Sequence, residues 1–330
     1  MKKKRLIFFF FLGLFFGEVQ AQFEAQFSQY AENKAAINPG AIAENDMING
    51  IFVVRQQWMG FKNAPRNIFA AVNTPVSIMG TDHGMGLSVL SSSAGLYVNQ
   101  NGLFQYSYKA KTSGKVLGLD LSGGVLSLGL NAGFIYQAFD WSKANVVPVD
   151  NGKPIENDFH RNEAFPTDTT GFSFDMGWGV FFSNEKMYAG FSGLHMPNTG
   201  VKYEGSSKEV KLYAPRVYYL TGGCNISLSN TLYVLKPSTL IKTDFKSYQM
   251  ELTGLLEYNK TIQGGLSYRF QDAFVFIVGI NLLNGLYAAY SYDLPISRMI
   301  LSGGSHEISL RYSFKPQFTG QSKHKVIHIL

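Results

Sequence analysis

Four of the six histidines could take part in catalysis or metal binding together with the serines and acidic residues of this chain. They are His83, His160, His195 and His306. None stands at the spacing from a cysteine, an acidic residue or another histidine that metal sites require, and no serine lies in the glycine-flanked turn that exposes a hydrolase nucleophile. We therefore expect neither an enzyme nor a bound cofactor or metal.

Two of these histidines have an acidic neighbour, but neither pair predicts a site. Asp82-His83-Gly84 has the composition of a turn, and we expect a periplasmic turn there. His306 and Glu307 are consecutive in an alternating segment, so in a strand their side chains would point to opposite faces. Gly303 and Gly304 would provide a tight bend into that strand.

The first 21 residues have the three parts of a secretory signal peptide. A positive stretch, Lys2 to Arg5, precedes an apolar stretch, Leu6 to Gly17, and a small-residue cleavage site ends at Ala21. The apolar stretch is shorter than the roughly 20 residues that a membrane-spanning helix needs. We expect an exported protein whose mature chain begins at Gln22.

Charge and cysteine content exclude two further classes. Without residues 1–21 the formal net charge falls from +6 to +3, with 25 basic and 22 acidic residues left, so charge gives no reason to expect a nucleic-acid partner. The single cysteine, Cys224, lies far from the cleavage site, which excludes a lipoprotein anchor there, and it has no partner for an internal disulfide. We expect it to be a buried thiol within a strand.

The composition of the mature chain favours strands over spanning helices. Aromatic residues make up 15% of the sequence and charged residues only 16%. The longest apolar run, Ala273 to Ile280, is too short for a spanning helix, whereas period-2 alternation recurs after Gly50. Only helices and closed barrels satisfy every backbone polar group in a bilayer, so a membrane protein with this pattern is a barrel. A soluble double-sheet sandwich is the rival, although it would carry more charge on its outer faces.

Alternation is nearly complete in four segments, 126–137, 172–180, 248–258 and 308–314. In the last, Ile308 and Leu310 oppose Ser309 and Arg311, which suits lipid outside and water inside. The polar faces of the expected strands also carry Glu251, Glu257, Arg269 and Arg311. These charges would either line a channel or pair with one another to fill the interior.

The predicted fold class is all-β: a transmembrane antiparallel β-barrel of about fourteen strands with an N-terminal plug or lid segment. The expected strands are residues 50–57, 67–74, 84–93, 102–111, 123–138, 172–182, 187–196, 215–226, 232–243, 247–258, 261–270, 273–282, 286–294 and 306–314. The longest connections, 139–171, 197–214 and 295–305, all follow odd-numbered strands. We expect these on the outer side, because such barrels keep their short turns in the periplasm.

The chain is thereby divided into a signal peptide (1–21), an N-terminal segment (22–49), the barrel (50–314) and a tail (315–330). The N-terminal segment does not alternate, and it could be a plug in the lumen, a periplasmic lid or a loosely ordered leader. The tail is expected on the periplasmic side. Its last residues, Val326 to Leu330, could pair with the sheet edge of a partner or fray.

Short motifs stand near both ends of the mature chain. The first are AQFSQY, which contains Phe27, Ser28, Gln29 and Tyr30; INPG, which contains Asn38 and Pro39; and RQQW, which runs from Arg55 to Trp58. The last are YSYD at Tyr290 to Asp293 and SGGSHEISLRYSF at Ser302 to Phe314, which contains Gly303, Gly304, His306 and Glu307. These motifs resemble the opening and closing patterns of the PorP/SprF family of outer-membrane proteins of the type IX secretion system. Gln56 stands where asparagine is commoner in that family, and Ala31 to Lys34 replaces more apolar residues.

The resemblance covers essentially the whole mature chain and implies a role in protein secretion across the outer membrane of Bacteroidota. It implies partners in the periplasm and outer membrane from the secretion machinery, and secreted cargo with a C-terminal sorting domain, including gliding adhesins. It also makes twelve of these motif residues candidates for partner contact: Phe27, Ser28, Gln29, Tyr30, Asn38, Pro39, Arg55, Trp58, Gly303, Gly304, His306 and Glu307.

Two functions from different classes remain open on the sequence. The first is a non-enzymatic barrel that supports export or surface anchoring of cargo. The second is an outer-membrane transporter of small hydrophobic molecules, since a barrel of about fourteen strands with an N-terminal plug also suits that role.

Overall fold

The computed structural model of this protein describes residues 24–45, 47–116, 119–120, 122–139, 149–150, 153–154, 169–197, 200–202, 211–282 and 285–315. The predicted signal peptide, His160 and the tail beyond Lys315 lie outside the described residues. No helix in the described part of the chain is both long enough and apolar enough to cross a membrane.

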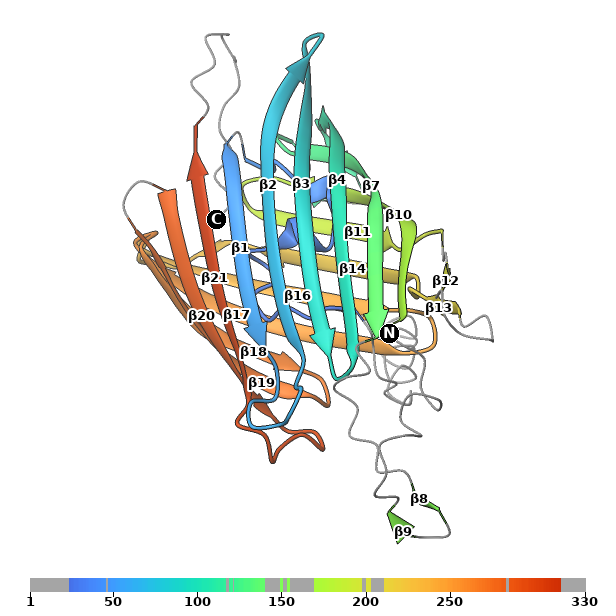
Figure 1. Ribbon diagram of the computed structural model, residues 1–330. Helices are drawn as coiled ribbons and strands as arrows, with labels where there is room; N and C mark the ends of the chain where they lie inside the picture. The colour runs from blue at the N-terminus through green and yellow to red at the C-terminus, as the bar shows by residue number, and fades with distance from the viewer. Residues whose placement is uncertain are drawn as a thin grey trace, which may run out of the picture.

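Fourteen long strands form the wall of an antiparallel barrel (Figure 1). They are β1 (Ile48–Gln56), β2 (Arg66–Ile78), β3 (Thr81–Ala94), β4 (Tyr97–Lys111), β7 (Val125–Phe139), β10 (Thr169–Ser183), β11 (Met187–Leu194), β14 (Val217–Cys224), β16 (Tyr233–Thr243), β17 (Tyr248–Tyr258), β18 (Ile262–Arg269), β19 (Ala273–Asn281), β20 (Leu286–Pro295) and β21 (Ser305–Phe314). Each one overlaps a strand expected from the alternation, in the same order.

The barrel closes because its first and last strands pair. In the ladder between β1 and β21, Ile48 lies opposite Phe314. Each of the remaining long strands pairs with the long strands that precede and follow it in the chain. The short strand β15 (Ile226–Ser227) continues the wall after β14 along β16. Closure removes the unpaired edges of an open sheet. The prediction of a closed antiparallel barrel of about fourteen strands is confirmed.

Three short hairpins belong to the connections between wall strands. They are β5 (Lys115–Val116) with β6 (Leu119–Asp120), β8 (Val149–Asp150) with β9 (Lys153–Pro154), and β12 (Gly200–Lys202) with β13 (Lys211–Tyr213). The connections after β7, β11 and β20 lie at one end of the barrel, which we call the loop end. Ile48 and Phe314 lie at the other, which we call the terminal end.

The wall is apolar outside and polar inside. In β7, Leu128, Leu130 and Phe134 are more than half exposed, whereas Ser127 and Asn131 are buried against the interior. The same division holds in β10, β17 and β21, as the alternation predicts. A barrel of this kind places its apolar belt in lipid.

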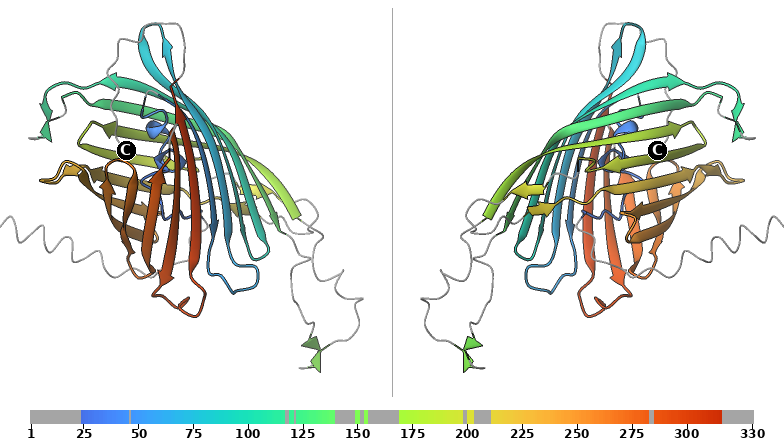
Figure 2. Two further views of the ribbon diagram at one scale, coloured as in Figure 1. Left: turned by 90° about the vertical axis from the view of Figure 1, so that its left-hand side faces the viewer. Right: turned by 90° about the vertical axis from the view of Figure 1, so that its right-hand side faces the viewer.

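The N-terminal segment (residues 24–45) lies inside the barrel, where Figures 1 and 2 show it in blue between the walls. It contains two 3₁₀ turns, η2 (Lys34–Ala36) and η3 (Pro39–Ala41). Three of the four hydrophobic clusters found among the described residues lie between this segment and the wall, and in one of them Phe27 packs with Val53, Phe69 and Leu90. The core of the barrel therefore depends on residues that come from outside the sheet.

Two local predictions were wrong. The turn expected at Asp82-His83-Gly84 is made by Met79 and Gly80, whose φ angles of 51° and 80° close a two-residue hairpin. His83 therefore lies within β3 and hydrogen-bonds to Tyr106. Cys224, expected to be buried, is only half-buried because it is the last residue of β14.

Replacement of Leu130 by arginine tests the lipid-facing belt. Leu130→Arg puts a charge near the middle of β7 on the outer face, so we expect the free energy of unfolding in lipid vesicles to fall by about 2–4 kcal/mol. Leu301→Arg, in the connection between β20 and β21, is the control, because Leu301 is 89% exposed there. A denaturant titration that gives equal losses for both variants would contradict the assigned belt.

Candidate functional site

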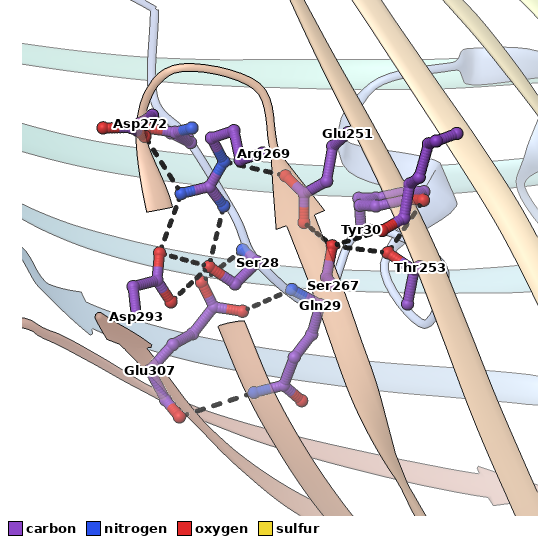
Figure 3. A network of polar contacts seen from close by, with 12 residues as sticks. Ser28, Gln29, Tyr30, Glu251, Thr253, Ser267, Arg269, Asp272, Asp293 and Glu307 are labelled. Carbon is purple, nitrogen blue, oxygen red and sulfur yellow. Dashed lines mark hydrogen bonds and ion pairs between the residues drawn. The ribbon is translucent and has the colours of Figure 1, made fainter. Parts of the chain in front are cut away.

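Seven buried polar residues form a cluster near the loop end, which we call the latch. Its members are Ser28, Gln29, Arg55, Glu251, Arg269, Asp293 and Glu307, each at most 3% exposed. Figure 3 labels all of them except Arg55. Two come from the N-terminal segment and the rest from the inner face of β1, β17, β18, β20 and β21. The latch therefore joins residues far apart in the sequence, and it ties the segment to the β1 and β21 seam.

The centre of the latch is the carboxylate of Glu307. The backbone N–H of Ser28 donates to its Oε2 atom at 2.8 Å, and the N–H of Gln29 donates to its Oε1 atom at 2.9 Å. Arg55 lies on the same side, with Nη1 at 3.4 Å from Oε2. Charge-assisted hydrogen bonds of this kind are among the strong ones in proteins. Glu307 thus holds the backbone of the N-terminal segment directly.

The hydroxyl group of Ser28 joins two arginines to one aspartate. It accepts hydrogen bonds from Arg55 at 2.7 Å and from Arg269 at 3.0 Å, and it donates to Asp293 at 2.8 Å. Both guanidinium groups also bind Asp293 directly, at 2.7 Å and 2.8 Å. A serine fills the position because it can accept twice and donate once.

Arg269 extends the network to the opposite side of the segment. Its Nε atom donates to Glu251 at 2.8 Å. Glu251 accepts from Ser267, which accepts from Thr253, which in turn accepts from the hydroxyl group of Tyr30. Because this chain of hydrogen bonds ends at the carboxylate of Glu251, which can only accept, each hydroxyl group in it donates to the next residue toward Glu251 (Figure 3). Tyr30 is thereby fixed by the same arginine that holds Ser28.

Charge balance explains why the latch needs the N-terminal segment. Two guanidinium groups face the three fully buried carboxylates of Glu251, Asp293 and Glu307. The N–H groups of Ser28 and Gln29 supply the donors that Glu307 lacks. Removing one partner of a buried ion pair typically costs about 3–5 kcal/mol, because the other charge stays buried without compensation.

A second ionic contact fixes the start of the described chain. His195, the first residue after β11, hydrogen-bonds to Asp175 at 3.0 Å and to Glu24 at 2.9 Å. Burial opposes the charged imidazole, but the adjacent carboxylate of Glu24 outweighs it and raises the pKa of His195 to about 10.

The middle of the segment docks against bare backbone. Asn38 caps η3 by accepting from the N–H of Gly40 at 2.8 Å, and its side-chain amide donates to the carbonyl of Val180 at 3.1 Å. A Cβ atom at Gly129 in β7 would overlap the backbone of Pro39 and Gly40, and one at Gly179 in β10 would overlap Asn38. Glycines in the wall therefore make room for the Asn38-Pro39-Gly40 turn.

Backbone hydrogen bonds join the connections on either side of the seam at the loop end. Met59 donates to the carbonyl of Gly304 at 2.8 Å and accepts from the N–H of Gly303 at 2.6 Å. The N–H of Trp58 donates to Ser305 at 3.2 Å. Trp58 and Gly304 have φ angles of 46° and 81°, so both positions are turns.

The structure thus distributes the twelve motif residues named from the sequence over several places. Ser28, Gln29, Arg55 and Glu307 meet in the latch, and Tyr30 is linked to it. Phe27 lies in the hydrophobic core, where its ring meets Phe69 edge to face. Asn38 and Pro39 form the turn against β7 and β10, whereas Trp58, Gly303 and Gly304 join the two connections.

His306 is separate from the latch. Its ring hydrogen-bonds to the hydroxyl group of Tyr290 at 2.6 Å, on the opposite side of β21 from Glu307. The expectation that His306 and Glu307 point to opposite faces is therefore met.

Sequence reasoning missed Asp293 as a site residue and missed the contact of Glu24 with His195. Asp293 belongs to the YSYD motif and lies at an inward position of β20, which was the available signal. The four charges expected inside the barrel are all paired: Glu251 with Arg269, Glu257 with Lys236, and Arg311 with Glu32.

The contacts of the latch dock the N-terminal segment on the inner face of the barrel. Within the described ranges, no group of three or more histidine, cysteine, aspartate or glutamate residues is placed to hold a metal ion. The arginines and carboxylates of the latch are used in holding the N-terminal segment.

A closed barrel with an apolar outer belt and a polar interior is typical of the class of outer-membrane β-barrel proteins. The model of the family described as type IX secretion system membrane protein PorP/SprF matches residues 19–312. The chain belongs to this family, and it is an outer-membrane protein. The resemblance drawn from the terminal motifs is confirmed.

No curated protein matches the sequence. Solved structures with a similar arrangement include a mutant of Rh. blastica porin, with 9% identity, a TM-score of 0.32 and coverage of 81% of this chain and 99% of that chain. The β-domain of the Bordetella autotransporter BrkA has 13% identity, a TM-score of 0.34 and coverage of 82% and 100%. CdiB from Acinetobacter baumannii has 8% identity, a TM-score of 0.34 and coverage of 81% and 60%.

Replacement of Arg55 by glutamine tests the latch. Arg55→Gln leaves Asp293 and Glu307 buried with one cation fewer, so we expect the free energy of unfolding in lipid vesicles to fall by about 3–5 kcal/mol. Arg66→Gln, at the exposed first residue of β2, is the matched control and should change little. Equal stability of the two variants in a denaturant titration would show that the latch does not hold the segment.

Replacement of Gly129 by alanine tests the fit of the Asn38-Pro39-Gly40 turn. The added methyl group overlaps the backbone of Pro39 and Gly40, so we expect the turn to leave the wall. The measurement is the rate at which a small thiol reagent labels Ala41→Cys in a Cys224→Ser background, and Gly129→Ala should raise that rate.

Gly254→Ala is the control for this experiment, because a Cβ atom at Gly254 meets nothing within 4 Å. An unchanged labelling rate in Gly129→Ala, together with unchanged stability, would rule out close docking of the turn on β7.

Proposed function

We propose that this protein supports export or surface anchoring of cargo by the type IX secretion system, including adhesins used in gliding. The observation that carries the proposal is the match of residues 19–312 to the PorP/SprF family, together with the closed barrel that places the chain in the outer membrane. The partners proposed are secretion components in the periplasm and outer membrane, and cargo with a C-terminal sorting domain.

The filled lumen supports a scaffolding role over a conduit role. The N-terminal segment contacts the inner face of strands on every side, from β1 through β10 to β20. One space beside it, lined by Glu32, Asn49 and Arg311 among others, has a volume of about 70 Å³. That space holds a few water molecules at most and is polar. An unfolded chain would need the segment to leave before it could pass through the barrel.

In the proposed role the barrel is therefore a fixed point in the membrane. The outer connections are available to cargo on the surface, and the short turns are available to components in the periplasm. The segment closes the lumen, as a plug does, so that the barrel does not leak while it holds its partners.

Deletion of the gene in its native host tests the proposal. We expect proteins with the sorting domain to decrease on the cell surface and to accumulate in the periplasm, as measured by surface proteolysis and mass spectrometry. An expressed wild-type copy should restore them, and the amount of an unrelated outer-membrane barrel should stay constant.

Cross-linking followed by purification from outer membranes gives an independent measurement of partners. The proposal predicts that secretion components or cargo are recovered with this protein. Unchanged surface display after deletion, with no secretion protein recovered by cross-linking, would overturn it.

A further inference from the structure

The path of the N-terminal segment through the barrel determines at which end of the barrel its free end lies. Glu24 contacts His195, directly after the last residue of β11, and its carbonyl accepts from Lys242, the second-last residue of β16. Both strands finish at the loop end. Ser28 lies at the same end, because Asp293 is near the end of β20 and Glu307 is near the start of β21.

The later residues of the segment lie progressively nearer the terminal end. The carbonyl of Ala35 accepts from Gln105 in the middle of β4. Ala43 donates to Asn73 at 3.0 Å, and Asn45 accepts from Asn49 at 2.7 Å, beside the first residues of β1. The chain therefore passes through the whole length of the lumen between Glu24 and Asn45, from the loop end to the terminal end.

The loop end is the outer end by the rule that such barrels keep short turns in the periplasm and long connections outside. The connections 140–168 and 195–216 lie at the loop end, whereas Met79-Gly80 and 184–186 are turns at the terminal end. Phe314, the last residue of the wall, is at the terminal end as well. Residue 24 and residue 314 therefore face opposite sides of the membrane.

We propose that the N-terminus of the mature protein is displayed at the cell surface, at the outer mouth of the barrel. Only two residues separate Glu24 from the cleavage site expected after Ala21. The segment is then a strap that is tethered to β1 on the periplasmic side and has its free end outside. The latch and the contact of Glu24 with His195 hold that free end at the outer mouth of the barrel. A ligand on the cell surface would therefore meet the strap at these contacts.

This topology also constrains assembly. A signal peptidase releases the N-terminus on the periplasmic side. A segment with its free end outside must then be enclosed when β1 and β21 pair, or be threaded through the closed barrel. Enclosure is the simpler route, because the latch uses residues on both sides of that seam. The inference concerns the topology and does not rest on the proposed secretion role.

Labelling of single cysteines on intact cells tests the proposal. Phe23→Cys in a Cys224→Ser background reports on the N-terminus, and it leaves Gln22 in place so that no cysteine stands at the cleavage site. Lys62→Cys, in the exposed connection after β1, reports on the loop end, and Lys315→Cys reports on the terminal end. The reagent is a maleimide that does not cross the outer membrane.

We expect Phe23→Cys and Lys62→Cys to be labelled equally before and after the outer membrane is permeabilised, and Lys315→Cys to be labelled only afterwards. Labelling of Phe23→Cys only after permeabilisation would overturn the proposal. Labelling of Phe23→Cys only after denaturation would overturn it too, because the end would then be buried. An epitope inserted after Gln22 and detected by antibody on intact cells provides a second measurement that does not depend on thiol reactivity.

Discussion

The carboxylate of Glu307, held by the backbone N–H groups of Ser28 and Gln29 beside Arg55, is the contact on which the interior depends. It joins the last strand of the wall to a segment that precedes the first strand. The same arginine binds Asp293, and Asp293 binds Arg269, so the β1 and β21 seam and the N-terminal segment share one set of charges. Loss of the segment would remove both backbone donors of Glu307 and leave Arg55, at 3.4 Å, as its remaining partner in the latch.

The barrel needs such a segment because its wall is apolar on the outside and polar on the inside. Because lipid takes the apolar face, the barrel cannot build its core from the larger part of its hydrophobic residues. The inward positions are mostly polar, and they need partners once water is excluded. Residues 24–45 supply both kinds of contact, through Phe27 and Ile37 in the hydrophobic clusters and through Ser28 and Glu24 in the ionic ones. The barrel and the segment therefore stabilise each other.

The strands were predictable from the sequence because alternation is a local property. Segments such as 126–137 and 308–314 show their two faces without reference to the rest of the chain. The partners in the latch were not predictable in the same way, because Ser28 and Asp293 are 265 residues apart and meet only after closure. The turn at Met79 and Gly80 was placed at Asp82-His83-Gly84 because that tripeptide also has turn composition, whereas a methionine with positive φ gives no sequence signal to set beside Gly80. The resemblance to the family identified the motif residues as candidates, but it did not predict which residues they contact.

Hydrogen–deuterium exchange of the N-terminal segment in lipid tests the central claim most directly. The amide groups of Ser28 and Gln29 donate to a fully buried carboxylate, so the account predicts that the peptide containing them exchanges as slowly as peptides from β1 and β21. Exchange at the rate of an unprotected chain, in a barrel whose strands remain protected, would contradict the account.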